Sequence, residues 1–342
     1  MITKELVVDY VFRILLPFAA AWFLALLVGK PSIEFLKKLR ARQTEREDGP
    51  ESHKVKNGTP TMGGIIFLIP MVIVTLLFLP FENADAMGVS RRPEMIAVLI
   101  PTVGFGLIGF LDDRLKVARH KNLGLRAWQK LALQFVVTLG FAAFLHFGTE
   151  VAMEEMILPF TGGKVLAFGI FTVPALIFIA LAVTNGSNLT DGVDGLCASV
   201  TIPVALFFAI AALLTCGPAA PAAAAMAGAL LGYLFYNFYP AKVFMGDTGS
   251  LAIGGFVLGM SYVLSLQLFI PIAGFIYALE ALSVLLQVGY FKATHGKRLF
   301  RMAPIHHHFE KGGWSETRVV GIFTAITILL SMLALAGISP AL

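Results

Sequence analysis

Three acidic patches interrupt a mostly apolar chain: Asp112-Asp113, the stretch Asn185–Asp194, and Asp247 within MGDTGS. Carboxylates beside long apolar runs are costly to place in a membrane, so they usually mark functional sites. Asp112 and Asp113 directly follow an apolar run, and neighbouring residues on a helix point about 100° apart. One of them could act as a general base while the other accepts hydrogen bonds or approaches a metal. The alternative is a solvated helix end, stabilised by i,i+4 pairing with Lys116.

The second patch, NGSNLTDGVDGL, carries polar side chains at every third residue: Asn185, Asn188, Asp191 and Asp194. A helical turn there is expected to bring these side chains roughly onto one face. Hard oxygen donors among glycines suit Mg²⁺ and the phosphates that it bridges. A turn with helix caps would explain the same composition without any ligand.

The third patch places Asp247 after Gly246 and ahead of another apolar run. This arrangement is typical of a helix N-terminus, where an acid can cap free N–H groups and where phosphate oxygens also bind. Phe244 could offer a flat surface to a nucleotide base, although aromatic residues also form belts at membrane interfaces. The patch therefore predicts a helix cap and an anion-binding helix start, which are compatible because the same donors serve either purpose.

Basic and imidazole side chains accompany these acids. Lys56 precedes the second apolar run, Lys130 begins the fourth, and the run His306–His308 lies in a basic loop near the end of the chain. Zinc prefers separated ligands such as H-x₃-H, so three consecutive histidines favour hydrogen bonds to phosphate over a zinc site. Glu280 interrupts an apolar run and is expected to be a buried carboxyl that is either hydrogen-bonded to a neighbour or kept protonated.

The elements that position these residues are predicted by hydropathy. Of the 342 residues, 57% are hydrophobic and 14% are charged, whereas soluble domains average about 25% charged. The sequence therefore predicts an all-α integral membrane protein, a single polytopic domain over residues 1–342 with about ten transmembrane helices in one bundle. The predicted spans are 14–29, 62–80, 94–111, 128–147, 165–183, 195–215, 222–238, 250–269, 272–290 and 319–338.

The distribution of positive charge predicts the orientation. Net charge is +5, and 21 of the 26 lysines and arginines fall in loops on one side, namely 30–61, 112–130, 239–249 and 291–318. The positive-inside rule makes that side cytoplasmic and puts both termini outside. All three acidic patches emerge there, which predicts an active-site cleft facing the cytoplasm. For any single basic residue, topology and attraction to anionic lipid remain a sufficient explanation.

The sequence thus combines acids that could hold a metal, basic groups that could bind phosphate, and a membrane-embedded frame. They favour phosphoryl transfer between a water-soluble nucleotide conjugate and a lipid held in the bilayer. Mg²⁺ would neutralise the diphosphate, and a cleft at the interface would let both substrates meet.

Five segments carry a close resemblance to a known family: SHKVKNGTPTMGG, FLDDRLKV, NGSNLTDGVDGL, NFYPAKVFMGDTGS and FRMAPIHHHFE. They resemble the signature segments of the phospho-N-acetylmuramoyl-pentapeptide transferases, within the polyprenyl-phosphate N-acetylhexosamine-1-phosphate transferase superfamily. The resemblance implies transfer of phospho-MurNAc-pentapeptide from its UDP conjugate, UDP-MurNAc-pentapeptide, to undecaprenyl phosphate. The products would be lipid I and UMP, and the reaction would require Mg²⁺ and serve peptidoglycan synthesis.

The resemblance also implies roles for individual residues. The catalytic acids would be Asp112, Asp113 and Asp247, with Asp247 and Asn188 serving the metal. Substrate contacts would come from Lys56, Lys116, Lys130, Asn185, Asn188, Asp191, Asp194, Asn237, Phe244, Gly246, His306, His307 and His308. The expected setting is the bacterial inner membrane, with a homodimeric enzyme and no nucleic-acid partner.

The order of chemical steps stays open at this point. Direct attack by the lipid phosphate on the β-phosphorus, with Asp112 as base, competes with a covalent phospho-enzyme on an aspartate. Two rival functions also remain. A sister transferase would use UDP-N-acetylglucosamine and differ in its sugar pocket, and a transporter would place charges near mid-membrane in paired halves.

Overall fold

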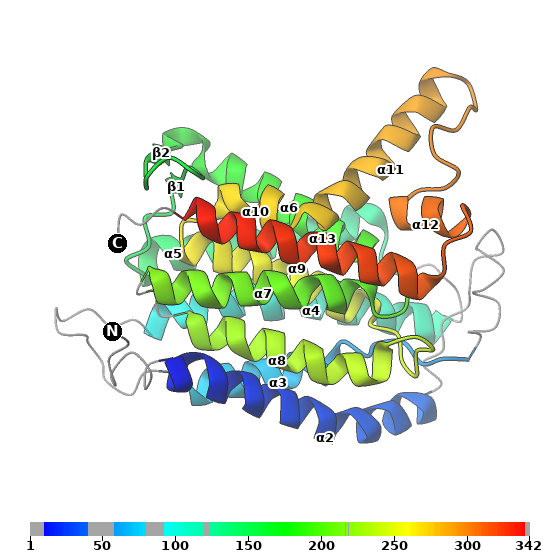
Figure 1. Ribbon diagram of the computed structural model, residues 1–342, viewed down its shortest axis with the longest axis horizontal. Helices are drawn as coiled ribbons and strands as arrows, with labels where there is room; N and C mark the ends of the chain where they lie inside the picture. The colour runs from blue at the N-terminus through cyan, green and yellow to red at the C-terminus, as the bar shows by residue number, and fades with distance from the viewer. Residues whose placement is uncertain are drawn as a thin grey trace.

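The computed structural model describes residues 10–39, 58–79, 92–119, 124–215, 217 and 219–338. Within these residues the chain is almost entirely helical, and most helices run roughly side by side through one bundle (Figure 1). The elements are η1 (Val11–Leu15), α2 (Leu16–Lys38), α3 (Ile65–Leu77), α4 (Arg92–Arg119), α5 (Ala127–Gly148), β1 (Glu155–Ile157), β2 (Val165–Ala167), η3 (Gly169–Phe171), α6 (Thr172–Thr190), α7 (Leu196–Leu214), α8 (Ala220–Asn237), α9 (Gly246–Val263), η4 (Gln267–Phe269), α10 (Ile270–Ala273), α11 (Phe275–Ala293), α12 (Ile305–Glu310) and α13 (Glu316–Gly337).

The helices confirm the prediction of an α-helical multi-pass membrane protein. Seven segments in the described part of the chain are long and apolar enough to cross a membrane; they contain α2, α4, α5, α6, α7, α11 and α13. Helices α3, α8 and α9 overlap the other three predicted spans. Helix α3 is apolar but has only 13 residues. The count of ten spans and the direction of the cleft therefore stay predictions.

Two predicted spans have different boundaries in the structure. The predicted span 165–183 starts inside a short antiparallel hairpin, in which Glu155 pairs with Ala167, so the helix begins only at Thr172. The predicted span 272–290 is interrupted at Gly274, which separates α10 from α11. Hydropathy alone misses both features, because the residues on either side of each break are equally apolar.

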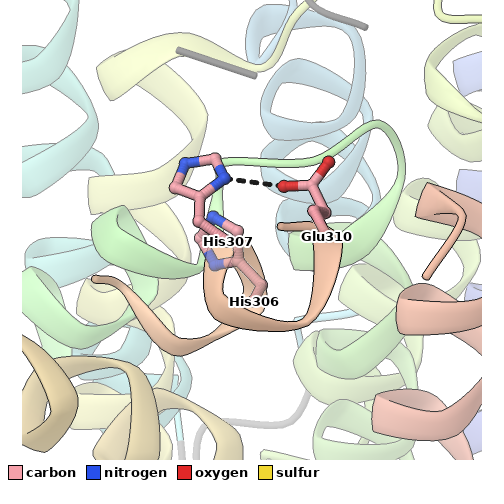
Figure 2. A group of neighbouring side chains, drawn as sticks. All are labelled: His306, His307 and Glu310. Carbon is pink, nitrogen blue, oxygen red and sulfur yellow. Dashed lines mark hydrogen bonds and ion pairs between the residues drawn. The ribbon is translucent and has the colours of Figure 1, made fainter. Parts of the chain in front are cut away.

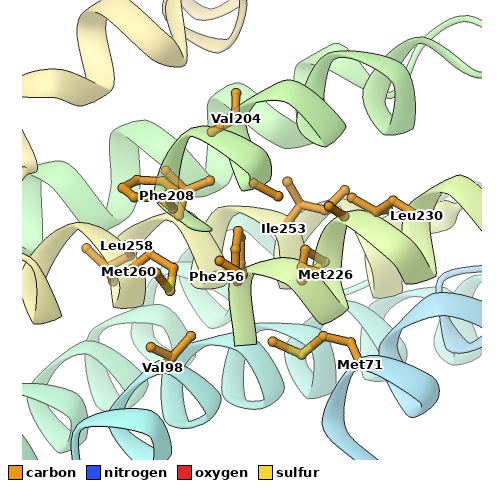
Figure 3. Packing of buried hydrophobic residues seen from close by; sticks show 14 of the residues in the cluster. Met71, Val98, Val204, Phe208, Met226, Leu230, Ile253, Phe256, Leu258 and Met260 are labelled. Atoms are coloured by element: carbon orange, nitrogen blue, oxygen red, sulfur yellow. The ribbon is translucent and has the colours of Figure 1, made fainter. Parts of the chain in front are cut away.

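Close backbone contacts between helices organise the core. On α9, Gly255 faces the Pro101 carbonyl of α4 so closely that an added Cβ would overlap it. Gly109 of α4 is equally close to the backbone of Asp247, and Gly228 of α8 meets the Phe18 carbonyl of α2. Small residues allow such approaches between membrane helices, where van der Waals packing drives association. Larger side chains fill the remaining interior, with Met71, Val98, Val204, Phe208, Met226, Leu230, Ile253, Phe256, Leu258 and Met260 in one cluster (Figure 3).

Helix α11 departs from this arrangement. Figure 1 shows it leaning away from the bundle, and the chain returns from its far end to α12, which lies close to the bundle. Much of its surface is apolar and exposed, including Leu282 and Leu285 at 53% and 67%. Its inner face buries Tyr277, Glu280 and Ser283. The helix thus presents leucines to its surroundings and holds one buried acid against the protein.

Candidate active site

The carboxylate of Asp113, near the end of α4, binds the start of α9. It accepts hydrogen bonds from the backbone N–H of Asp247 at 3.1 Å and of Thr248 at 2.9 Å. The Thr248 hydroxyl donates a third bond at 2.7 Å. The first N–H groups of a helix lack intrahelical partners and attract negative charge, so Asp113 acts as a cap supplied by another helix. This contact fixes where Asp247 enters the site.

A glycine makes that contact possible. Gly246 has a φ of 71°, and a Cβ at this position would lie 2.5 Å from Oδ2 of Asp113. Left-handed backbone is costly for other residues, and the short approach excludes a side chain. Gly246, predicted as a substrate contact, therefore has a structural reason to be glycine, and its contact with substrate stays a prediction.

Two lysines neutralise most of the acidic charge. Lys116 Nζ lies 2.6 Å from Asp112 and 3.1 Å from Asp247. Lys130, in the first turns of α5, lies 2.7 Å from the same Asp247 oxygen. Three carboxylates and two ammonium groups leave about one net negative charge if all are ionised. Asp112 also accepts a 2.7 Å hydrogen bond from the Leu125 N–H.

The acids fit a divalent cation. One carboxylate oxygen each of Asp112, Asp113 and Asp247 lie within 4.8 Å of one another. Carboxylate oxygens are the hard ligands that Mg²⁺ prefers, and the residual negative charge favours a cation. Among the described residues, this group comes from two helices that cross closely, so its geometry is held by the fold.

Asn188 joins this cluster but Asn185 does not. The Asn188 amide donates to Asp247 Oδ1 at 2.9 Å and to the Ser250 hydroxyl at 3.0 Å. Asn185 is exposed and donates to the Leu181 carbonyl of its own helix. The expectation of a single polar face was wrong, because α6 continues to Thr190 and a three-residue step on a helix turns about 300°. The orientation of the Asn188 amide turns its nitrogen to Asp247, whereas metal ligation would use its oxygen.

Asp191 follows the last residue of α6, and the negative charges of the site act on its carboxyl group. Desolvation, together with the negative charges of Asp247, Asp113 and Asp194, raises the pKa of Asp191 to about 8. A hydrogen bond from the Gly246 backbone opposes that shift. Asp191 therefore lies within electrostatic range of these acids, and its predicted contact with substrate stays a prediction.

Asp194 and Asn237 are buried and hold backbone. Asp194 accepts a 2.9 Å bond from the Ala241 N–H. Asn237 accepts from the Gly195 N–H at 3.1 Å and donates to the Val243 carbonyl at 3.0 Å. Both were predicted to line the nucleotide-sugar cleft. In the structure they join the loop after α6 to the segment before α9, and a direct substrate contact stays a prediction.

The His306 and His307 rings lie 4.1 Å apart, and one ligand atom each of His306, His307 and Glu310 lie within 4.8 Å of one another. His306 is fully buried, with Nδ1 3.1 Å from Glu280. His307 lies 2.6 Å from Glu310, the contact drawn in Figure 2. His308 accepts a hydrogen bond from the Arg301 N–H at 3.1 Å. Each histidine therefore has a partner within the protein, and the predicted phosphate contacts stay a prediction.

Two predicted residues remain, Phe244 and Lys56. Phe244 is half-buried, and its backbone N–H donates to the Pro60 carbonyl while its carbonyl accepts from Gly63. The next residue in the sequence, Met245, is buried. Lys56 lies outside the described residues.

Sequence reasoning missed three polar residues that support the acids. Thr248 and Ser250 stand in the MGDTGS segment, and their hydroxyls bond Asp113 and Asn188. The helix-start pattern of this segment could have identified Thr248 and Ser250, because hydroxyl side chains are common at helix N-termini. Glu316, in the first turn of α13, accepts a hydrogen bond from the Asp194 N–H at 3.4 Å. No local sequence pattern predicts that contact.

Comparisons with known protein sequences identify the family of this chain. Residues 95–265 match the family model described as glycosyl transferase family 4, and residues 56–68 match one described as phospho-N-acetylmuramoyl-pentapeptide-transferase signature 1. The phospho-N-acetylmuramoyl-pentapeptide-transferase of Clostridioides difficile strain 630 is 46% identical over 320 residues, 93% of this chain and 95% of that protein. The Moorella thermoacetica protein of the same name is 45% identical over 325 residues, 94% of this chain and 96% of its own length. Such identity over nearly the full length shows that the chain belongs to the phospho-N-acetylmuramoyl-pentapeptide transferase family.

Proposed function

We propose that this chain transfers phospho-N-acetylmuramoyl-pentapeptide from UDP-MurNAc-pentapeptide to undecaprenyl phosphate, giving lipid I and UMP. One observation carries the proposal. The ends of α4, α5, α6 and α9 bring Asp112, Asp113, Asp247, Asn188 and two lysines into one polar cluster on a helical membrane frame. Family membership supplies the substrate class, and this cluster supplies groups that suit a diphosphate.

The metal proposed for this site is Mg²⁺. Asp112, Asp113 and Asp247 would hold it, with Asn188 keeping Asp247 in position. When bound, the ion supplies charge neutralisation for the diphosphate oxygens. The hydrogen bonds to Asp113 and Asn188 keep both residues oriented toward α9 before any ligand arrives.

We favour direct transfer over a covalent phospho-enzyme. An oxygen of the lipid phosphate attacks the β-phosphorus, and the bond between that phosphorus and the bridging oxygen of UMP breaks as UMP leaves. Asp113 already accepts three hydrogen bonds, and Asp247 is paired with two lysines and Asn188, so neither is a free nucleophile. Asp112 is the candidate base. Its benefit is small, because a phosphate monoester is largely ionised at neutral pH. Lys116 and Lys130 lie where they stabilise charge on the departing UMP.

The proposed setting is the bacterial inner membrane. The active site faces the cytoplasm and both termini lie outside, since most basic residues fall in loops on the side of the acids. The enzyme is proposed to act as a homodimer without a nucleic-acid partner.

Release of UMP from UDP-MurNAc-pentapeptide by the purified protein tests the proposal. We expect release only when undecaprenyl phosphate and Mg²⁺ are both present, together with formation of a lipid-linked sugar. UDP-N-acetylglucosamine serves as the matched donor. Turnover of that donor instead would assign the chain to a sister activity, and labelled phospho-sugar trapped on protein without lipid would overturn direct transfer.

A further inference from the structure

Glu280 is a fully buried acid on a helix that otherwise faces apolar surroundings. Its neighbours Leu282 and Leu285 on α11 are exposed, whereas Glu280 has 0% exposure. A carboxylate in such a place is expensive unless a partner compensates it. The partner is His306, whose Nδ1 lies 3.1 Å from Oε2 of Glu280, and both side chains are completely buried.

This contact connects two elements and orients a ring. Glu280 belongs to α11, and His306 is the second residue of the short helix α12. Because the Glu280 carboxylate packs against the Nδ1 edge of the ring, the Nε2 edge lies on the opposite side. Both ring nitrogens of His306 and both carboxylate oxygens of Glu280 are buried without an aligned hydrogen bond within the described residues, so the two side chains meet as a close buried contact of 3.1 Å.

The Nε2 edge lies against the loop that follows α6. A Cβ placed on Gly192 would collide with Nε2 of His306 and lie 2.6 Å from its Cε1. The imidazole therefore contacts the loop backbone directly, and only glycine leaves room for it. The residue before Gly192 is Asp191, which feels the charges of Asp247 and Asp113.

The other half of this loop is held by different partners. The Asp194 N–H donates to Glu316, and the Asp194 carboxylate accepts from Ala241. The Gly195 N–H donates to Asn237. These bonds fix residues 194 and 195. In the half that carries Asp191, the His306 ring packs on Gly192 and the Gly246 backbone donates to Asp191.

We propose that Glu280 is a positioning residue, which holds the His306 ring against Gly192 and thereby keeps Asp191 beside Asp247. The proposal rests on the proposed transferase function for its effect on turnover. Its structural part, the ordering of the loop, is independent of that function. Glu280 touches neither substrate nor metal and acts from inside the protein.

Two substitutions approach the contact from opposite ends. Glu280→Gln preserves shape and an acceptor but removes the charge, and Gly192→Ala inserts a methyl group against the ring. We expect each to lower kcat for UMP release about 10- to 100-fold, with a smaller change in KM. The double variant should be no slower than the worse single one, because both disturb the same contact. Thr327→Val, which removes a buried hydroxyl bonded within α13, is the matched control and should keep wild-type kcat.

Amide hydrogen exchange of residues 188–195, measured without substrate, separates the two proposals. We expect faster exchange in both test variants, and unchanged exchange in Thr327→Val. If the wild-type protein releases no UMP but the loop loosens as expected, the positioning stands and the transferase function fails. Wild-type exchange in both variants, or normal kcat in Glu280→Gln alongside an active wild type, would overturn the positioning. Additive losses in the double variant would overturn it as well.

Discussion

The Asp113 carboxylate accepts hydrogen bonds from both the backbone N–H and the hydroxyl of Thr248, at 2.9 and 2.7 Å. Thr248→Val removes the hydroxyl bond alone and leaves the buried carboxylate partly unsatisfied. We expect a loss of about 1–3 kcal/mol in stability and about tenfold in kcat, since supporting partners orient catalytic acids. Thermal unfolding in detergent and UMP release measure the two effects. Ser261→Ala, which removes a hydroxyl bonded within the same helix, should leave kcat unchanged.

Asp247→Asn is expected to abolish turnover and to weaken the dependence on Mg²⁺. The substitution removes the charge that Lys116 and Lys130 share and a hard oxygen ligand of the proposed metal. Titration of UMP release against Mg²⁺ concentration gives the answer. Normal turnover with an unchanged metal requirement would refute the metal assignment.

Lys130→Met should separate metal binding from substrate binding. It changes the charge of the cluster from about −1 to −2, so Mg²⁺ should bind more tightly, while the diphosphate loses a cation. We expect the Mg²⁺ concentration for half-maximal rate to fall and the KM for UDP-MurNAc-pentapeptide to rise. Lys292→Met, at the exposed end of α11, is the control and should change neither. A rise in both constants would show that Lys130 does not act through Asp247.

Gly246→Ala should be severe, because a Cβ there lies 2.5 Å from Asp113 and the backbone is left-handed. We expect the variant to lose most of its activity. We also expect its free energy of unfolding to fall by about 1–3 kcal/mol because of backbone strain. Gly321→Ala on α13 is the matched control, since nothing lies within 4 Å of the added methyl group. It should be neutral or slightly stabilising. Equal behaviour of the two variants in unfolding and UMP release would contradict the packing around Asp113.

Asp191 should make stability depend on pH in the absence of Mg²⁺. Its folded pKa of about 8 lies above the ordinary value of 3.8, so the folded protein binds a proton that the unfolded chain has lost. That contribution is fully present below about pH 4, declines as pH rises, and is gone above about pH 8. Asp191→Asn cannot ionise, so the difference between variant and wild-type melting temperatures in EDTA should shift in favour of the variant from pH 5 to pH 8. A difference that stays constant with pH would contradict the environment described for Asp191.

The sequence predicted the helical architecture and the convergence of the acids, because both depend on hydropathy and chain order. Three apolar-run boundaries bring Asp112, Asn188 and Asp247 to one end of the bundle. The fate of Asn185 was not predictable, since it depends on whether α6 ends before or after that residue. The break at Gly274 was likewise invisible in an uninterrupted apolar run.

Long-range polar partners were also out of reach. Glu280 was expected to be hydrogen-bonded to a neighbour or kept protonated. The structure places its carboxylate 3.1 Å from the buried His306 without an aligned hydrogen bond, and that pairing depends on how α11 leans. Glu316 meets Asp194 across 122 positions of sequence. A single sequence carries no information on such pairs, because neither spacing nor local propensity changes when a distant residue approaches.

The glycine-lined crossing of α4 and α9 has a consequence for motion. Gly109 and Gly255 bring the two backbones into touch at separated points along their length, so neither helix can slide or tilt without collision. The acids at that end of α4 and α9 are therefore carried by two helices that move as one rigid unit. Any conformational change that accommodates the glycopeptide substrate must then come from α11 and the loops next to it. Spin labels placed on α4 and α9 should report one narrow distance distribution with and without bound substrate.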